Sequence, residues 1–280
     1  MKKALGLAIV LLLVLAGCGG TPATSGSTAS DSMTGTGVVV PADEDYFEWD
    51  GNIITALTDE GAAQESITIP SNCEGFSDFV FSVKENKVKS VSFAQAPTCD
   101  VKDMLSFSAL EQVILPAQMT EVVDNMFSFC SNLGSIEIPA GVTRVGQFAF
   151  SDNTSLSKVT FLGDAVTKID QYAFRGCTSL GEVNLPANLA EVGDSAFAGC
   201  TSMNSLTLPS SLKTVGLLAF ADCGLEDLYV PEDLQFDTVA DTSFYQVGRV
   251  LRVHVVEGSW MDLNFDNVFL DDNYYEKVYG

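Results

Sequence analysis

The stretch AFRGCTSLGEVNLP at Ala173–Pro186 recurs almost unchanged as AFAGCTSMNSLTLP at Ala196–Pro209. The same frame can be followed in both directions from these two copies, with a period of 22 to 24 residues. Its fixed point is a phenylalanine, which stands at residues 127, 150, 174, 197, 220 and 244. A repeat of this length predicts a solenoid, because one copy cannot bury its apolar face alone and stacked copies can.

Each position in the repeat has a physical role. In the first five copies a small residue comes three residues after the phenylalanine, and it is Asn153 in the second copy and Cys130, Cys177, Cys200 or Cys223 in the other four. A leucine or methionine follows, and then a short strand that alternates between buried and exposed positions, at 136–138, 159–161, 183–185, 206–208 and 228–230. Proline ends most of these strands, because it has no backbone N–H to donate. We therefore expect a parallel sheet along one side of the coils and a column of phenylalanine rings inside.

The repeat can be written as L-x-x-[IV]-x-[IL]-P followed by [IV]-G-x-x-[AS]-F-x-G-C-x-[SN]-L, and it runs from about Leu110 to Leu225. This motif resembles that of the BspA-like leucine-rich-repeat (LRR_5-type) surface proteins of bacteria. The resemblance implies a right-handed leucine-rich-repeat coil, mostly strand and loop, capped at both ends. It also implies a role in binding a protein or a host-surface ligand. One copy departs from the motif, because Leu162 replaces the proline and should leave the strand end less sharply stopped.

The remaining segments divide the chain into regions. Asp50-Gly51 between apolar residues predicts a hairpin, which we assign to an amino-terminal cap at 43–87. The solenoid is expected at 88–248, with its best repeats at 110–225. A last strand is expected at 250–259, within a carboxy-terminal strand and cap at 249–280. The aromatic and acidic residues from Trp260 onward are expected to form a helix or short strands.

The amino-terminal residues indicate export and a lipid anchor. Lys2 and Lys3 precede an uncharged apolar run, which is typical of a signal peptide at 1–17. The run ends in LAGC at Leu15–Cys18, which resembles a lipoprotein lipobox and implies cleavage before Cys18 and lipid attachment to its sulfur. The alternative is an ordinary signal peptide that is cleaved elsewhere. The Gly-, Ser- and Thr-rich segment within 18–42 is expected to be a flexible tether, so that the protein would lie outside the cytoplasm at the cell envelope.

The charge of the chain excludes one class of partner. A formal net charge of −23 repels nucleic-acid phosphates and anionic lipid headgroups, so contact with the membrane is expected through the anchor alone. The acidic residues are expected to keep the surface soluble. Divalent cations or basic partners are the alternative reading of the same charge.

The cysteines and the single histidine offer little chemistry. We expect the cysteines of the repeat to form a ladder of buried, inert thiols along the turns. Cys73 and Cys99 lie outside the repeat register, and either a disulfide between them or two separate buried thiols is possible. No CxxC is present and His254 is the only histidine, which argues against a zinc site.

Catalytic and cofactor motifs are also missing. The chain contains no GxSxG, P-loop or dinucleotide-binding motif in context, and residues 271–273 lack the frame of a calcium loop. His254 is expected to be an isolated residue at the surface or on an edge strand. A pair of carboxylates for glycoside hydrolysis stays open, but we expect no enzyme and no cofactor.

Stacking the coils predicts a binding surface on the outward side of the strands. Two rows should form, Gln112, Ser135, Lys158, Glu182, Ser205 and Asp227 in one and Ile114, Glu137, Thr160, Asn184, Thr207 and Tyr229 in the other. Only Ile114 and Tyr229 are large enough to anchor a protein ligand. Two other functions stay open: glycan or small-ligand capture in an aromatic pocket near Trp260, Tyr274 and Tyr275, and a structural, self-associating envelope protein with exposed strand edges.

Overall fold

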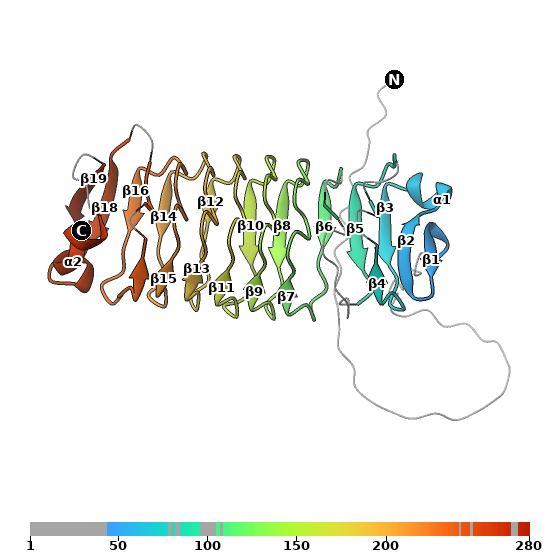
Figure 1. Ribbon diagram of the computed structural model, residues 1–280, viewed down its shortest axis with the longest axis horizontal. Coiled ribbons are helices and arrows are strands. Elements are labelled where there is room, and N and C mark those ends of the chain that lie inside the picture. Colours follow the sequence, from blue (N-terminus) through green and yellow to red (C-terminus); the bar gives the residue numbers. More distant parts are fainter. Residues whose placement is uncertain are drawn as a thin grey trace, which may run out of the picture. The chain divides into compact units, whose positions relative to one another are not determined.

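A computed structural model describes residues 44–77, 80–81, 85–95, 105–106, 109–240, 242–246, 249–269 and 274–280. The expected solenoid is confirmed: the coils from β6 to β18 stack side by side in chain order (Figure 1). Each central coil contributes a strand to a first sheet, a two-residue strand to a second sheet, and a turn segment. Cys18, Cys99 and residues 271–273 lie outside the described residues. Lipidation therefore stays a prediction, and the choice between a Cys73–Cys99 disulfide and two separate thiols stays open.

The first sheet contains the predicted alternating strands. Its members are β3 (Ser66–Ile69), β5 (Ser90–Phe93), β6 (Gln112–Ile114), β8 (Ser135–Ile138), β10 (Lys158–Phe161), β12 (Glu182–Val183), β14 (Ser205–Thr207), β16 (Asp227–Tyr229), β18 (Leu251–Val255) and β19 (Tyr275–Tyr279). They pair in parallel as β3-β5-β6, β8-β10-β12 and β14-β16-β18-β19, and β6 lies beside β8 as β12 lies beside β14. We call the outward surface of this row the strand face.

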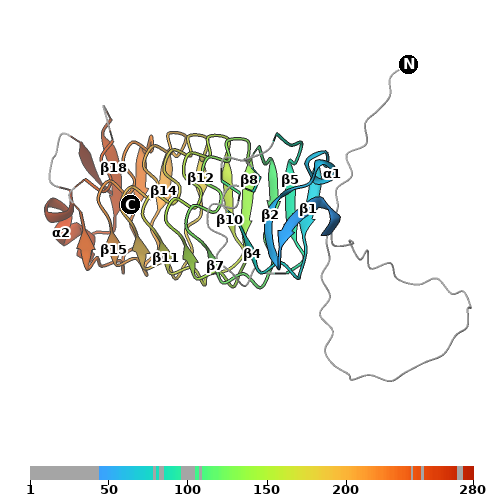
Figure 2. The same ribbon diagram turned by 45° about the vertical axis from the view of Figure 1, so that its right-hand side comes forward.

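A second sheet was not predicted. It consists of β7 (Glu121–Val122), β9 (Arg144–Val145), β11 (Lys168–Ile169), β13 (Glu191–Val192), β15 (Thr214–Val215) and β17 (Thr238–Val239), all in parallel (Figure 2). The expectation of a sheet on one side only was therefore incomplete. A two-residue strand offers one inward and one outward side chain, which is too short to produce a recognisable alternation.

The turn segments form a third surface, which we call the turn face, at 125–129, 148–152, 172–176, 195–199 and 218–222. The first and last residue of each segment has a positive φ, as in Tyr172 (61°) and Gly176 (72°). Their backbones form a ladder along the stack. Tyr172, Phe174 and Gly176 donate N–H bonds of 3.0, 2.7 and 2.8 Å to carbonyl groups of the next coil.

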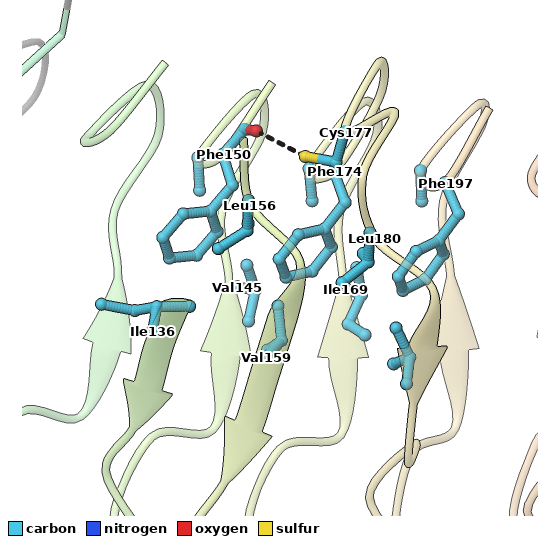
Figure 3. Close-up of a cluster of buried hydrophobic side chains, with 14 of the residues drawn as sticks. Ile136, Val145, Phe150, Leu156, Val159, Ile169, Phe174, Cys177, Leu180 and Phe197 are labelled. Carbon is cyan, nitrogen blue, oxygen red and sulfur yellow. Dashed lines mark hydrogen bonds between the residues drawn. The ribbon is translucent and has the colours of Figure 1, made fainter. Parts of the chain in front are cut away.

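The phenylalanine column lies between these surfaces, as predicted. Phe127, Phe150, Phe174, Phe197, Phe220 and Phe244 are at most 2% exposed, and neighbouring rings stack with centroids 5.1 to 5.3 Å apart. Figure 3 shows the rings of three coils one behind another, with Ile136 and Val159 of the first sheet and Val145 and Ile169 of the second sheet beneath them. The column is the shared core of the stack, and each ring is covered by its neighbours.

The expected ladder of buried thiols is present. Cys130, Cys177, Cys200 and Cys223 each donate to a carbonyl of the preceding coil, and Sγ of Cys177 lies 3.1 Å from the carbonyl oxygen of Phe150 (Figure 3). Burial raises the pKa of Cys177 to about 12 and also raises that of Cys200. Asn153 fills the same position and is fully buried, yet neither Nδ2 nor Oδ1 has a hydrogen-bond partner among the described residues.

At the amino-terminal end, the predicted hairpin is confirmed. β1 (Phe47–Asp50) pairs antiparallel with β2 (Ile53–Leu57) through a turn in which Gly51 has φ 63°. Around it lie η1 (Glu44–Tyr46), α1 (Asp59–Ala62) and β4 (Gly75–Phe76), which pairs in parallel with β2. β3 already belongs to the first sheet, so the row of strands begins inside the segment 43–87 that we expected to be a cap.

At the carboxy-terminal end, β18 is followed by α2 (Trp260–Val268) and by β19. The strand expected at 250–259 is present as β18, and the helix or short strands expected from Trp260 onward are present as α2 and β19. β18 is not the last strand of the sheet, because β19 pairs with it in parallel, with Leu251 opposite Tyr275 and Val255 opposite Tyr279. Only Tyr275 of β19 is buried, so the alternation that marks the other strands is missing. No helix in the described part of the chain is long and apolar enough to cross a bilayer.

Candidate functional site

The strand face brings the predicted rows together. Lys158 lies opposite Ser135 on one side and Glu182 on the other, and Thr160 lies opposite Glu137. In the next group of strands, Ser205 pairs with Asp227, and Thr207 with Tyr229. Gln112 and Ile114 lie on β6, beside β8, and Asn184 directly follows β12. The register of the coils thus places side chains of successive copies next to one another, as the repeat predicted.

The two predicted anchors are accessible. Ile114 is 45% exposed and Tyr229 is 44% exposed. They lie near opposite ends of the central coils, on β6 and β16. The residues between them are small or polar, so the strand face has two separate apolar points and a polar middle.

Both rows continue beyond the residues that we predicted. β18 places Arg252 opposite Asp227 and His254 opposite Tyr229. The signal for this was available in the alternating segment LRVHV at 251–255, with leucine and the valines buried and arginine and histidine outward. The expectation of an isolated histidine was wrong, because β18 is an inner strand and His254 contacts two side chains of β16.

These four residues form what we call the Asp227 cluster: Asp227, Tyr229, Arg252 and His254. Nε and Nη2 of Arg252 donate to the two carboxylate oxygens of Asp227 at 2.8 and 2.6 Å. Nε2 of His254 lies 2.7 Å from Oδ1 of Asp227, and the His254 ring stacks on Tyr229 with centroids 4.4 Å apart. Hydrogen bonds from Arg252, and then from His254, hold the pKa of Asp227 well below its usual range.

The chemistry of the Asp227 cluster suits binding. Both oxygens of Asp227 are engaged by neighbours, so the carboxylate is fixed in its charged form and is a poor general base. Tyr229 is 44% exposed, and the side chain of Arg252 is 46% exposed. Tyrosine and arginine are both enriched among the residues that dominate protein interfaces. Within the described residues, no three His, Cys, Asp or Glu side chains gather to hold a metal ion.

The second sheet carries a charge network of a different kind. Arg144 bonds Glu121, Asp124 and Asp170, and Lys168 bonds Asp170 and Glu191. The bond to Glu191 is the main reason that the pKa of Lys168 is raised. These ion pairs join neighbouring coils, and each of the two cations is held by at least two carboxylates, so we interpret this surface as structural.

The alternative function of glycan or small-ligand capture predicted an aromatic pocket near Trp260, Tyr274 and Tyr275, and the contacts of these side chains do not support it. Trp260 packs edge-on against Phe236 at 6.3 Å, and Tyr274 packs edge-on against Tyr245 at 5.2 Å. Tyr275 is buried against Phe269. The three predicted side chains therefore have three different partners and act in packing.

Comparison with known proteins agrees with this architecture. The family profile of the BspA type leucine rich repeat region matches in six copies over residues 60–181 and 167–259. No match was found among the curated proteins.

Several solved structures are similar to the chain. A leucine rich repeat protein of T. pallidum (TpLRR) has 23% sequence identity and a TM-score of 0.43, and the match covers 76% of this chain and 84% of that one. A leucine-rich repeat protein from Bacteroides ovatus has 17% identity, coverage of 76% and 83%, and a TM-score of 0.32. A leucine rich cell surface protein from Faecalibacterium prausnitzii has 18% identity, coverage of 79% and 86%, and a TM-score of 0.30.

The family assignment rests on the profile, which covers well over half of the 280 residues and coincides with the coils that carry the phenylalanine column. The chain belongs to the family of BspA-type leucine-rich-repeat proteins.

Proposed function

We propose that this protein is a non-enzymatic, lipid-anchored binding protein on the outside of the cell, and that its strand face takes a protein ligand. The observation that carries the proposal is the Asp227 cluster at one end of an ordered, accessible polar sheet. Solenoids usually bind through extended surfaces of this type.

The Asp227 cluster has the features of an interface hot spot. Arg252 is held by two bonds to Asp227, and Tyr229 is held by its stack on His254. Side chains that are fixed before binding lose less conformational freedom when a partner arrives. An exposed tyrosine and an exposed arginine, both already ordered, therefore give a partner a favourable anchor.

The binding test uses variants that the repeat itself supplies. Tyr229→Thr places in β16 the residue that the neighbouring coil has at Thr207, and Arg252→Ser places in β18 the residue type of Ser205. Both changes should leave the fold intact. The matched control, Glu191→Thr on the second sheet, copies Thr214 of the next coil.

The full chain, purified in detergent, is screened by surface plasmon resonance against immobilised extracellular matrix proteins. We expect at least one matrix protein to bind, the double variant Tyr229→Thr/Arg252→Ser to weaken that binding by at least about tenfold, and Glu191→Thr to leave it unchanged. Binding that the double variant retains would move the ligand away from the strand face. If no immobilised matrix protein binds and the chain associates with itself in a concentration-dependent way, a structural envelope protein would be favoured.

The anchor is tested separately. Cys18→Ala removes the only sulfur at the lipobox, so the protein should move from the membrane fraction to the soluble or secreted fraction. Cys73→Ala is the control for loss of a cysteine elsewhere and should stay in the membrane fraction. A Cys18→Ala chain that remains with the membrane would contradict lipidation at this residue.

A further inference from the structure

The turn face is hollowed by a groove, which is separate from the strand face. The groove is open to solvent, has a volume of about 980 Å³ and extends over successive coils from Phe148 to Tyr245. Most of its lining residues belong to the turn segments, and it was not foreseen from the sequence.

The hollow exists because two neighbouring coils have small residues where the flanking coils have large ones. At the first position of the turn segments, Ser195 stands between Tyr172 and Leu218. At the last position, two glycines, 176 and 199, stand between Asp152 and Asp222. The floor is therefore formed by backbone and small side chains, and carboxylates stand at both ends.

One wall of the groove is an aromatic stack. The rings of Phe148 and Tyr172 lie 4.7 Å apart with an angle of 21° between their planes, and the guanidinium carbon of Arg175 lies 5.8 Å from the centre of the Tyr172 ring. No ion pair or side-chain hydrogen bond of Arg175 is found among the described residues, and Arg175 is part of the lining of the groove.

The backbone N–H groups of the turn face already donate hydrogen bonds to carbonyl groups of the next coil. Phe174 and Gly176 donate to Ala196 and Ala198, and Phe197 and Gly199 donate to the coil after that. A peptide that binds in extended form usually gains its affinity from main-chain bonds to an open edge. The turn face offers no such edge along the groove, so recognition must come from side chains.

The charges of the groove are mixed. Asp152 and Asp222 disfavour an anionic chain, as does the net charge of −23, and Arg175 disfavours a cationic one. Carboxylate and guanidinium groups together offer acceptors and donors for hydroxyl groups. An aromatic wall beside a few such polar groups is the usual composition of a small-molecule site. We propose that the groove between Tyr172 and Leu218 binds a neutral oligosaccharide that lies along the stack of coils.

The repeat again supplies variants that should fold. Ser195→Tyr fills the hollow with the residue that the preceding coil has at Tyr172, where the backbone has the same positive φ (52° and 61°). Arg175→Ala copies Ala198, the equivalent residue of the next coil. Tyr229→Thr on the strand face is the control. Circular dichroism and urea unfolding establish that each variant is folded.

The full chain in detergent is titrated by isothermal calorimetry with neutral oligosaccharides of glucose, galactose, mannose and N-acetylglucosamine. We expect at least one of them to bind, Ser195→Tyr and Arg175→Ala each to weaken that binding by at least about tenfold, and Tyr229→Thr to leave it unchanged.

Three results would overturn the inference: no binding by any of these sugars, sugar binding that both groove variants retain, or groove-dependent binding of a lysine-rich peptide in place of the sugars. None of these results bears on the proposed protein ligand, because that proposal rests on the strand face and is tested by different variants.

Discussion

The imidazole ring of His254 stacks on the phenol ring of Tyr229, with an angle of 14° between the planes. The two residues come from strands β16 and β18, which pair in parallel, and the same imidazole reaches Asp227. Because Arg252 bonds both oxygens of Asp227, the four side chains form one connected unit. Removing one member is expected to loosen the others, since the contacts share partners.

The first prediction concerns acid stability. The pKa of Asp227 is lowered by folding, so this carboxylate stabilises the fold above its unfolded pKa of about 4, and the contribution is lost as the pH falls below that value. We predict that Asp227→Asn is less stable than wild type at neutral pH by about 1 kcal/mol and that the difference narrows below about pH 4. Urea unfolding at a series of pH values measures both quantities.

Glu137→Gln is the control for this experiment, because Glu137 lies on the same face and makes no ion pair among the described residues. It should leave the pH profile unchanged. A difference between Asp227→Asn and wild type that stays constant down to about pH 2 would contradict a role for the Asp227 charge.

The second prediction concerns the phenylalanine column. Phe174 is fully buried and stacks on both neighbouring rings, so Phe174→Ala should lower the free energy of unfolding by about 3–5 kcal/mol. The control is Phe129→Ala, because Phe129 is 45% exposed and its loss should cost less than about 1 kcal/mol. Equal losses in the two variants, measured by urea unfolding, would show that the column does not carry the stability of the stack.

The sequence was sufficient to predict the core and the first sheet for a physical reason. A fixed repeat length places equivalent residues of stacked coils next to one another, so the burial of Phe174 and the pairing of Thr160 with Glu137 follow from counting. The turn face could not be predicted in this way. Bulky residues such as Phe148 and Tyr172 adopt a positive φ there, although such residues seldom do so and carry no turn signal.

The site was predicted only in part because its other half lies beyond the clear repeats. Arg252 follows Phe244 by eight residues, the interval that also separates Phe197 from Ser205. The copies beyond Leu225 match the motif only loosely, so the register of Arg252 and His254 with Asp227 and Tyr229 was not assigned, although this count supports it. The groove on the turn face depends on which residues are small at one position of neighbouring coils. That Ser195 opens a groove becomes visible only when the structure shows which positions of neighbouring coils lie on one surface.

The third prediction concerns the reactivity of the thiol ladder. Burial raises the pKa of Cys177 to about 12, and only the thiolate reacts with alkylating reagents. We predict that iodoacetamide at pH 8 leaves Cys177 unmodified in the folded chain and modifies it in urea, as read by mass spectrometry of its peptide.

An exposed cysteine introduced on the strand face as Lys158→Cys should react under both conditions and serves as the control for this experiment. Because the pKa of Cys177 is raised by folding, the fold should also lose stability as the pH rises from about 8.5 toward about 12. Alkylation of Cys177 in the native state would contradict the burial of the ladder.

The fourth prediction concerns the one break in that ladder. Asn153 is buried with no partner for either polar atom of its side chain among the described residues, whereas Cys177 in the next coil donates to the carbonyl of Phe150. Asn153→Cys should remove two unsatisfied groups and provide a thiol for the carbonyl of Phe127, so the free energy of unfolding should rise by about 1–3 kcal/mol. The reverse change, Cys177→Asn, should lower it by a similar amount. Both are measured by urea unfolding under reducing conditions. The prediction is contradicted if Asn153→Cys is no more stable than wild type and Cys177→Asn is folded and as stable as wild type. Hydrogen bonding at this position of the repeat would then have no effect on stability, and the bonds from the other thiols to carbonyl groups would contribute nothing to the stack.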